Sequence, residues 1–337
     1  MVDSLLSSSD KLFHGARVLI TGGLGFIGAN LALKLLEQGA QLTLVDNLLR
    51  GAGGNEHNIH SFRDRVHAIQ GDLRDPKVIK QCLPDQQYIF NLAGHTSHQD
   101  SMRMPDLDLE MNMRAQLSLL EGCRQHNPDA RIVFAGTRQV YGKPRYLPVD
   151  EIHPVVPVDI NGIHKFAGEM YHHLYLQVHG IETTVLRLTN TYGPRMRVRD
   201  DRQTFLGTWI KRLLSGESLK IYGDGEQLRD FNYVSDVVEA LLMSATSRDA
   251  VGKTYNLGSR QVVSLGTLAQ MLADIQGTGS FERVPFPAPR KRIDIGDYNG
   301  DFSLIEADLG WSPQIDLKTG LARTLNFFED NREHYWP

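Results

Sequence analysis

The amino-acid sequence predicts an α/β fold in which a doubly wound parallel sheet is accompanied by a smaller C-terminal α/β region. Short apolar runs typical of buried strands alternate with segments of helical apolar spacing through residues 17–188. That alternation implies right-handed crossovers and helices on both faces of one sheet. After Tyr192 the pattern loosens and prolines and arginines accumulate, which indicates a second, loop-rich region.

Each element is predicted from its own apolar pattern. Strands are expected at Arg17–Thr21, Gln41–Val45, Val66–Gln70, Tyr88–Ala93, Arg131–Ala135 and Glu182–Leu188. Helical spacing predicts helices over Phe26–Gln38, Leu107–Gln125 and the run DINGIHKFAGEMYHHLYLQV from Asp159. Gly39 ends the first helix, because glycine tolerates the left-handed backbone that closes a helix.

Composition argues against several kinds of partner. The 337 residues carry a net charge of −4 with no long basic run, so nucleic acid is not an expected partner. The beginning MVDSLLSSSDKLFHGA lacks the apolar core of a signal peptide, and no later stretch approaches the ~20 apolar residues of a membrane span. We therefore expect a cytoplasmic protein with no membrane partner. Cys82 and Cys123 are expected to be core thiols, since they have neither disulfide-framework nor metal-ligand spacing.

A glycine-rich turn predicts a dinucleotide site. TGGLGFIG lies between the first strand and the first helix and places Gly23, Gly25 and Gly28 at the spacing G-x-G-x-x-G. These glycines allow a tight turn and a close approach of the backbone to a pyrophosphate at the helix N-terminus. Asp46 ends the next strand, where a carboxylate accepts hydrogen bonds from a ribose diol and repels a 2′-phosphate. NAD is therefore predicted rather than NADP.

Asp72 and Lys165 are further candidates for cofactor contact. Asp72 lies in GDLRD after the third strand, where it could meet the adenine end, or the segment could be only a turn that caps the next helix at Asp75. Asn161 and Lys165 are four residues apart in DINGIHK and so share one helix face. Taken alone, that pair is more typical of a solvated helix surface.

Nine motifs follow one another along residues 16–330: TGGLGFIG, GDLRD, NLAG (Asn91–Gly94), TRQVYG (Thr137–Gly142), Lys165, RLTNTYGPR (Arg187–Arg195), YGDGEQLRDFNYVSD (Tyr222–Asp236), YNLGS (Tyr255–Ser259) and LGWSP (Leu309–Pro313). In this order they resemble the extended short-chain dehydrogenase/reductase family, and within it the NAD-dependent nucleotide-sugar epimerases and dehydratases. The resemblance implies a nucleotide-diphosphate sugar as substrate and a homodimer, commonly formed through a four-helix interface.

The resemblance also implies two domains with a cleft between them. A Rossmann-like NAD-binding domain is expected over residues 14–192 plus about 230–248, and a sugar-nucleotide-binding domain over residues 193–229 and 249–337. The expected cofactor contacts are Gly22, Gly25, Phe26, Ile27, Gly28, Asp46, Asn47, Asp72, Leu73, Leu92, Ala93, Gly94 and Lys165.

Several site residues follow from the resemblance, position by position. Thr137 matches the hydroxyl partner of the substrate, Lys165 matches the catalytic lysine, and Asn112 matches a structural asparagine of the family.

Substrate contacts are likewise expected from the resemblance. They are Asn190 and two arginines, Arg229 and Arg292, whose guanidinium forks suit diphosphate oxygens. Arg229 could instead pair with Asp230 or Asp236.

Two departures from the family pattern concern the chemistry. A family tyrosine, four residues before the lysine, takes the proton of the substrate hydroxyl as hydride leaves. Asn161 stands at that position, and an amide is not a general base near neutral pH. Arg138 and Gln139 stand where dehydratases carry an Asp-Glu pair and decarboxylases a glutamate, so a conventional 4,6-dehydratase is disfavoured. Arg138 could contact an acidic substituent such as a uronate, or fold onto Asp150 or Glu151.

A replacement base is expected among a few groups. His95 and His98 follow the fourth strand in GHTSHQDS, where the family's substrate-facing loop runs, and histidine suits proton transfer near neutral pH. Each of these histidines could equally be structural. Tyr141 and water are the other candidates, whereas His164 lies about 100° around the helix from Lys165 and is expected to face away.

Three functions stay open at the level of sequence. The leading one is an NAD-dependent nucleotide-sugar epimerase that oxidises a sugar hydroxyl transiently, with Thr137 orienting the hydroxyl and a non-standard base. The others are an unconventional dehydratase or keto-sugar epimerase, and a non-catalytic protein that binds NAD or a sugar nucleotide. The fold alone does not choose among them.

Overall fold

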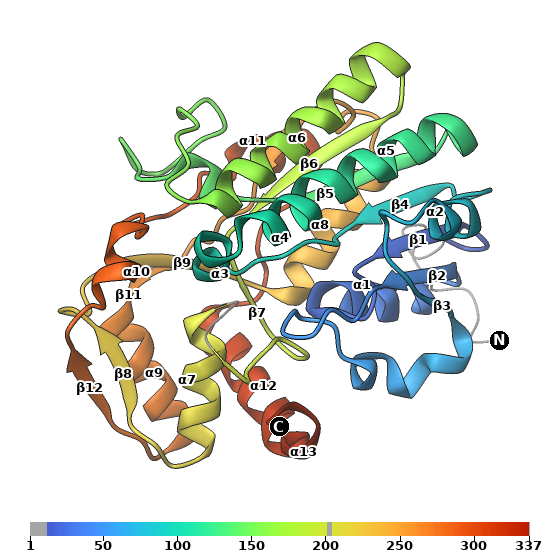
Figure 1. Cartoon of the computed structure of the whole chain (residues 1–337). Coiled ribbons are helices and arrows are strands. Elements are labelled where there is room, and N and C mark those ends of the chain that lie inside the picture. The colour runs from blue at the N-terminus through green and yellow to red at the C-terminus, as the bar shows by residue number, and fades with distance from the viewer. Residues whose placement is uncertain (1–11, 201–203, 337) are drawn as a thin grey trace.

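A computed structural model describes residues 12–200 and 204–336, and its centre is a seven-stranded parallel sheet (Figure 1). The strand order is β10-β6-β5-β4-β1-β2-β3. The strands are β1 (Arg17–Thr21), β2 (Gln41–Asp46), β3 (His67–Gln70), β4 (Tyr88–Asn91), β5 (Arg131–Thr137), β6 (Thr183–Leu188) and β10 (Thr254–Asn256). The predicted doubly wound parallel sheet is therefore confirmed.

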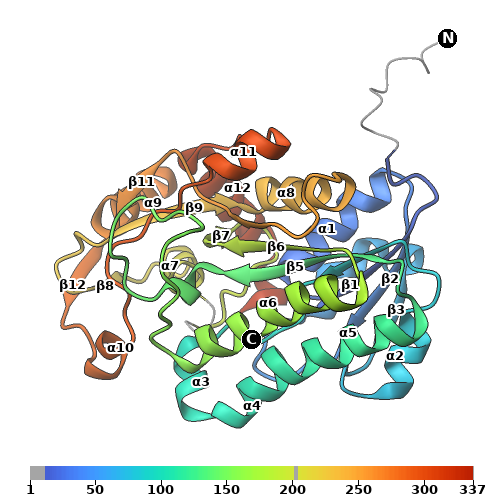
Figure 2. The same ribbon diagram turned by 90° about the horizontal axis from the view of Figure 1, so that it is seen from above.

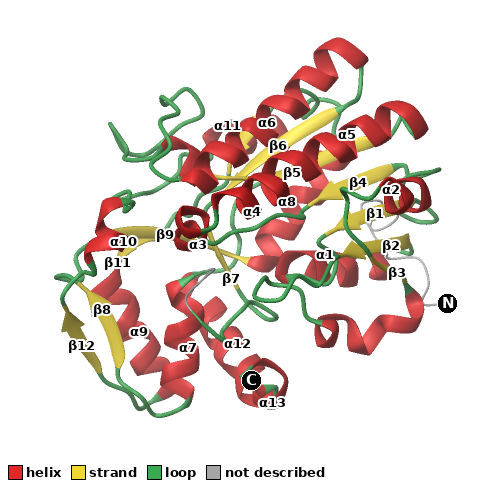
Figure 3. Ribbon diagram, viewed as in Figure 1, coloured by secondary structure: helices red, strands yellow, loops and turns green. Residues whose placement is uncertain are grey.

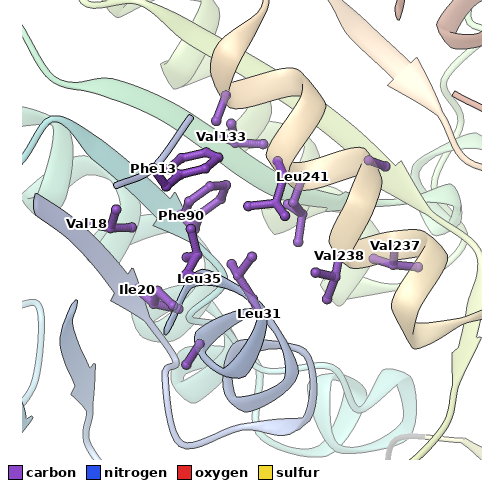
Figure 4. Packing of buried hydrophobic residues seen from close by; sticks show 14 of the residues in the cluster. Phe13, Val18, Ile20, Leu31, Leu35, Phe90, Val133, Val237, Val238 and Leu241 are labelled. Atoms are coloured by element: carbon purple, nitrogen blue, oxygen red, sulfur yellow. The ribbon is translucent and has the colours of Figure 1, made fainter. Parts of the chain in front are cut away.

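Helices cover both faces of this sheet (Figures 1 and 2). One face is packed by α1 (Phe26–Glu37) and α8 (Val234–Thr246), and Figure 4 shows their core, which includes Leu31, Phe90 and Leu241. The other face is packed by α2 (Pro76–Cys82), α5 (Ala115–His126) and α6 (Ile160–His179). Cys82 and Cys123 are both buried in this second core, as predicted, and burial raises the pKa of each thiol to about 12.

A smaller lobe is built from the C-terminal half of the chain (Figure 3). β11, β9 and β7 form one small sheet and β12 pairs with β8, around an apolar core that includes Leu213, Leu268 and Phe328. The elements are β7 (Asn190–Tyr192), α7 (Phe205–Leu214), β8 (Leu219–Tyr222), β9 (Leu228–Tyr233), β11 (Val262–Ser264), α9 (Leu265–Gln276), β12 (Phe281–Val284), α10 (Ala288–Arg292), α12 (Leu317–Asp330) and α13 (Arg332–Tyr335).

Part of the C-terminal segment that the sequence assigned to the smaller lobe belongs to the larger lobe. β10 and α11 (Ser303–Leu309) lie within the predicted sugar-nucleotide segment 249–337, yet β10 pairs with β6 in the main sheet. Tyr255 and Trp311 from this segment are buried in the core of the larger lobe. The sequence did not reveal this because β10 has only three residues, which is too short for a strand pattern.

The segment between β4 and β5 is more broken than predicted. α3 (His98–Arg103) and α4 (Pro105–Leu109) precede a π-helical turn at Glu110–Arg114, which leads into α5. The sequence predicted one helix over Leu107–Gln125, because a short π turn leaves the apolar spacing nearly unchanged. Short 3₁₀ helices at Glu56–Arg65 and Arg138–Tyr141 complete the larger lobe.

The strand order places a crevice at the carboxyl ends of the strands. The chain runs outward from β1 through β2 to β3 and then returns to β4 on the other side of β1. Ligands of open α/β sheets bind where the order reverses in this way.

Within the described part of the chain, no helix combines the length and the apolar character that crossing a bilayer requires. Most of the N-terminal segment on which the signal-peptide expectation rests, residues 1–11, lies outside the described residues.

Candidate active site

The glycine turn forms the floor of the cleft at the carboxyl end of β1. Gly22 has a left-handed backbone with φ of 68°, and a Cβ added to Gly28 would lie 2.3 Å from the carbonyl oxygen of Gly22. Both positions therefore need glycine. Gly25 is the N-cap of α1 and no described side chain caps this helix, so its first N–H groups remain for an anionic ligand. The turn thus fits the pyrophosphate of a dinucleotide.

Asp46 ends β2 at the edge of the same cleft. Its Oδ2 accepts a hydrogen bond from the N–H of Leu24 at 3.2 Å, and its Oδ1 accepts one from the N–H of Leu48 at 2.9 Å. Burial raises the pKa of Asp46, and these two hydrogen bonds oppose the rise. The backbone therefore fixes the carboxylate at the edge of the cleft, and its contact with a ribose diol stays a prediction.

The GDLRD motif contains both a cleft residue, Asp72, and the helix cap that the sequence offered as an alternative, Asp75. Asp72 lines the cleft, and a 2.7 Å ion pair with Arg74 lowers the pKa of Asp72 to about 2. Asp75 in the same motif caps α2 by accepting a hydrogen bond from the N–H of Lys77 at 2.9 Å. The GDLRD motif is thus both a helix cap and part of the cleft wall.

The structure brings together every residue that the sequence assigned to cofactor binding. One continuous cleft is lined by Gly22, Gly25, Phe26, Ile27, Gly28, Asp46, Asn47, Asp72, Leu73, Leu92, Ala93, Gly94 and Lys165. Thr137, Asn161 and His95 line the same cleft.

Lys165 is a buried cation in the wall of this cleft. Its Nζ donates to the carbonyl oxygen of Ala135 at 3.3 Å and lies 5.3 Å from the ring centroid of Phe134. Burial lowers the pKa of Lys165 to about 8, against the attraction of Asp108. A Cβ added to Gly94 would come within 2.8 Å of Nζ, so the glycine keeps this space open.

Asn161 shares the cleft with Lys165 but is tied to the protein by its side chain. Its Nδ2 donates to the carbonyl oxygen of His95 at 2.7 Å and to Oδ2 of Asp108 at 3.0 Å. Its backbone N–H donates to Oγ of Ser101 at 3.2 Å. The amide therefore holds the loop after β4 in place instead of serving as an acid or base.

Asp108 is the buried centre of a polar cluster that the sequence did not reveal. Its carboxylate lies 3.5 Å from Nδ1 of His95 and 2.8 Å from Nδ1 of His164. Burial alone would raise the pKa of Asp108, but the polar side chains around it, those of His95, Asn161, Asn112 and His164, lower it to about 2. His164 is absent from the residues that line the cleft, as the helical geometry predicted.

Asn112 supports the same loop, in keeping with a structural role. Its Oδ1 accepts a hydrogen bond from the backbone N–H of His95 at 3.0 Å, and its Nδ2 donates to the carbonyl oxygen of His95 at 2.9 Å. Asn112 and Asn161 thus fix the backbone of His95 from two helices.

His98 forms a second histidine–carboxylate pair. Its Nδ1 lies 3.0 Å from Oδ2 of Asp159, the N-cap residue of α6. Gln139 donates to the same oxygen at 2.7 Å, and the N–H of Gly162 donates to Oδ1 at 2.7 Å. Burial would raise the pKa of Asp159, but the nearby His98 ring helps to hold it below its ordinary value. Because Nδ1 lies beside this carboxylate, Nε2 is the ring nitrogen of His98 that could meet a ligand in the cleft.

Tyr141, a candidate base in the sequence, is not in the cleft. Its side chain is completely buried, donates to Oδ1 of Asn256 at 2.7 Å and accepts a hydrogen bond from Arg187 at 2.6 Å. Burial raises the pKa of Tyr141 to about 12 against the effect of Arg187. The structure gives no support to this tyrosine as a base.

A second cavity adjoins the cleft in the smaller lobe and contains one of the two predicted arginines. Arg229 lines this cavity, and its Nη2 lies 3.5 Å from Oδ1 of Asp294. Arg229 thus pairs with Asp294 and not with Asp230 or Asp236, the partners considered from sequence. Arg292 is exposed and does not line either cavity; its neighbour Arg290 lines the second cavity instead. α10 has only five residues, too few for an apolar pattern that could have distinguished the two arginines.

The two cavities meet at a shared wall, which we call the junction. It consists of His98, Arg138, Gln139, Asn190 and Thr204, the residues that line both cavities. A ligand extending from the second cavity towards Lys165 must pass these side chains.

The fold and the cleft together define a dinucleotide-binding α/β protein. The chain belongs to the NAD dependent epimerase/dehydratase family, whose model matches residues 18–258. The predicted family, its enzymatic character and its cofactor NAD are therefore confirmed.

Relatives of known name match nearly the whole chain. UDP-glucuronic acid decarboxylase 1 of Xenopus tropicalis is 33% identical over 338 residues, which cover 98% of this chain and 75% of that protein. The structure of UDP-glucose 4-epimerase from Thermotoga maritima with UDP-glucose superposes with a TM-score of 0.85 at 29% identity, covering 94% of this chain and 99% of that one. UDP-glucose 4-epimerase of Thermus thermophilus, in complex with NAD, gives a TM-score of 0.82 at 28% identity, covering 93% of this chain and 98% of that one.

Proposed function

We propose that this enzyme is a nucleotide-sugar epimerase that oxidises a sugar hydroxyl transiently, and that His98 takes the hydroxyl proton. The observation that carries the proposal is the place of His98. It belongs to the junction and pairs through Nδ1 with Asp159, while Lys165 and Thr137 line the adjoining cleft. A histidine whose far nitrogen is engaged by a carboxylate is a typical arrangement for proton transfer.

The groups that could act as base differ in chemistry and in access to the cleft. Asn161 has no basic atom and its Nδ2 is engaged by His95 and Asp108. The side chain of His95 is 8% exposed, whereas that of His98 is 36% exposed and borders both cavities. Among the candidates named from sequence, His98 therefore has the best access to a bound sugar.

The proposed reaction conserves atoms and electrons. When bound, NAD would supply the hydride acceptor and, for the return step, the hydride donor. Nε2 of His98 takes the proton of the hydroxyl on the carbon whose C–H bond breaks, which leaves a ketone. Thr137 hydrogen-bonds the reacting oxygen, and Lys165 holds the cofactor ribose. After the sugar turns its other face, His98 returns the proton and the opposite configuration results.

The substrate class is proposed from the second cavity and from the relatives. Arg229 offers donors suited to a diphosphate, and Tyr222 and Phe286 line the same cavity as aromatic surfaces for a base. Relatives named for UDP-glucose and UDP-glucuronic acid cover most of the chain. We therefore propose that the substrate of this enzyme is a nucleoside-diphosphate sugar.

A product analysis tests the proposed function. The NAD-loaded protein is incubated with UDP-, GDP-, CDP- and dTDP-sugars in deuterated water, and the products are identified by NMR. Transient oxidation predicts inverted sugar without deuterium on carbon. Deuterium on the inverted carbon would instead indicate enolisation of a keto-sugar, and loss of water would indicate a dehydratase. Binding without any turnover would favour a non-catalytic role.

We also propose that the enzyme acts as a homodimer in the cytoplasm. α5 and α6 lie side by side on one face of the sheet (Figure 2). Ile163, Met170, Leu174 and Val178 are exposed on α6 at a spacing that keeps them on one stripe. The two buried free thiols suit a reducing compartment.

The dimer proposal is tested by light scattering after size-exclusion chromatography. Leu174→Glu should shift the protein to the monomer mass, whereas Ile152→Glu, at an exposed apolar residue outside α5 and α6, should leave the dimer intact. A wild-type monomer would refute the proposed association.

A further inference from the structure

Arg138 lies where a bound sugar would pass between the two cavities. It follows β5 at the start of a 3₁₀ helix and belongs to the junction. Its Nη2 donates to Oδ1 of Asn190 at 3.1 Å, and its guanidinium carbon lies 4.8 Å from the ring centroid of Tyr298. These two contacts orient the planar guanidinium within the wall.

Among residues 12–200 and 204–336, no counter-ion is in direct contact with the positive charge of Arg138. Within this described part of the chain it forms no ion pair within 4.0 Å, and its buried Nη1 has no hydrogen-bond partner. The two acidic residues considered from sequence are engaged elsewhere, because Asp150 accepts from the hydroxyl of Tyr146 and Glu151 accepts from the N–H of Asn256.

Asp230 and Asp294 attract Arg138 from a greater distance but do not neutralise it by contact. Oδ1 of Asp230 accepts a hydrogen bond from Thr189 and its Oδ2 accepts one from the N–H of Gly300 at 2.9 Å, while Asp294 lies 3.5 Å from Arg229. The junction itself contains no acidic side chain, and Asp159, which touches it, is already held by His98 and Gln139. A cation withdrawn from water in this way is stabilised by an anion that the ligand supplies.

We propose that Arg138 selects a nucleotide sugar whose hexose carries a carboxylate, that is, a nucleoside-diphosphate hexuronate. The inference rests on the proposed function, because it assumes that the sugar crosses the junction to reach the nicotinamide. A guanidinium matches a carboxylate with two parallel hydrogen bonds, whereas the hydroxymethyl group of a neutral hexose offers one weak acceptor. Arg229 lines only the second cavity and remains for the diphosphate.

Calorimetry on the NAD-loaded protein tests this selectivity with matched ligand pairs. The pairs are UDP-glucuronate with UDP-glucose, and GDP-mannuronate with GDP-mannose. In at least one pair the uronate should bind about 10- to 100-fold more tightly, the range of a hydrogen bond to a charged group. Arg138→Met should abolish that preference by weakening the uronate alone, and Arg138→Lys should retain part of it.

Controls separate recognition from folding and from turnover. Arg292→Met, at an exposed arginine outside both cavities, should keep the preference, and NAD affinity should be unchanged in every variant. The proposal is overturned if neither uronate is preferred, or if Arg138→Met weakens both members of a pair equally, as loss of a diphosphate contact would. Uronate preference without epimerisation would overturn the proposed function and leave this inference standing. If the wild type shows no uronate preference and Arg138→Met epimerises neutral sugars at the wild-type rate, this inference is overturned and the proposed function stands.

Discussion

The two ends of the cleft differ in how closely they keep the family pattern. At the cofactor end, the glycine turn, Asp46 and Lys165 stand where the motifs require them, and all of them line one cavity. At the reacting end, Asn161 stands where the resemblance predicts a tyrosine, and Arg138 stands where dehydratases of the family are expected to carry an aspartate. If the proposed roles hold, the comparison teaches that cofactor binding and proton transfer are separable in this fold, because different side chains would carry them.

The difference has a physical basis in what holds each end together. The cofactor end is fixed by the backbone: Gly22 and Gly28 in the turn, and the N–H groups of Leu24 and Leu48 on Asp46. The reacting end is fixed by side chains that bridge distant helices, such as Asn161 to Asp108. Side-chain contacts can change without disturbing the sheet, and so the chemistry can change while the cofactor site stays.

The largest expected effect comes from the proposed base. His98→Asn should lower kcat by about 10²- to 10⁴-fold, the usual contribution of general acid–base catalysis. NAD affinity should stay the same, because His98 belongs to the junction and is not among the expected cofactor contacts. Initial rates measured with the best substrate of the nucleotide-sugar panel check this.

The matched control for that experiment is the other histidine pair. His95→Asn leaves the His98–Asp159 pair intact and should reduce kcat far less. If His95→Asn causes the larger loss, the two ends of the cleft are coupled through Asp108 and the assignment of His98 is wrong.

A smaller effect is expected in the second cavity. Arg229→Ala should weaken sugar-nucleotide binding by roughly 1.5 to 3 kcal/mol, as expected for a hydrogen bond to a charged group. Arg292→Ala serves as the control because Arg292 is exposed and lines neither cavity. Parallel titrations with NAD should show no change in either variant. A loss of NAD affinity in Arg229→Ala would identify Arg229 as a structural residue, in keeping with its hydrogen bond to the carbonyl oxygen of Leu228.

The smallest effect concerns the pH dependence of stability at the cofactor end. Burial lowers the pKa of Lys165 from 10.5 to about 8, so the unfolded chain holds the proton over a pH range in which the folded chain has lost it. The free energy of unfolding therefore rises with pH between about 8 and 10.5. Relative to Lys165→Met, the protein without NAD should gain about 1 to 2 kcal/mol between pH 7.5 and 9.5, by the linkage slope of 1.36 kcal/mol per pH unit. Urea titrations at both pH values measure this, and parallel pH curves for the two proteins would rule out a buried, titrating lysine.

The sequence predicted best where a residue depends on its neighbours along the chain. The glycine turn and the strand-end aspartate follow from local spacing, and the helix face shared by Asn161 and Lys165 follows from helical geometry. These residues all line the cleft. Their roles in binding remain predictions.

The sequence predicted least where contacts join distant elements. Asp108 meets Asn161 across 53 positions and His164 across 56, and nothing near Asp108 in the sequence marks it. Asp159 stands at the start of the helical run predicted from sequence, but no local pattern marks its contact with His98. The choice of Arg290 over Arg292 depended on the rotation of a short helix, and the burial of Tyr141 depended on packing against Arg187.

The most direct test of the account restores the missing tyrosine. If proton transfer has moved to His98, the tyrosine of Asn161→Tyr has no role to fill and breaks the hydrogen bonds of Asn161 to His95 and Asp108. Epimerisation by a variant that is folded and binds NAD should then be unchanged or slower. If the protein has only lost its base, the tyrosine stands one helical turn before Lys165 and should restore hydride transfer. A gain of about a hundredfold, within the range of general acid–base catalysis, would contradict the claim that His98 replaced the tyrosine.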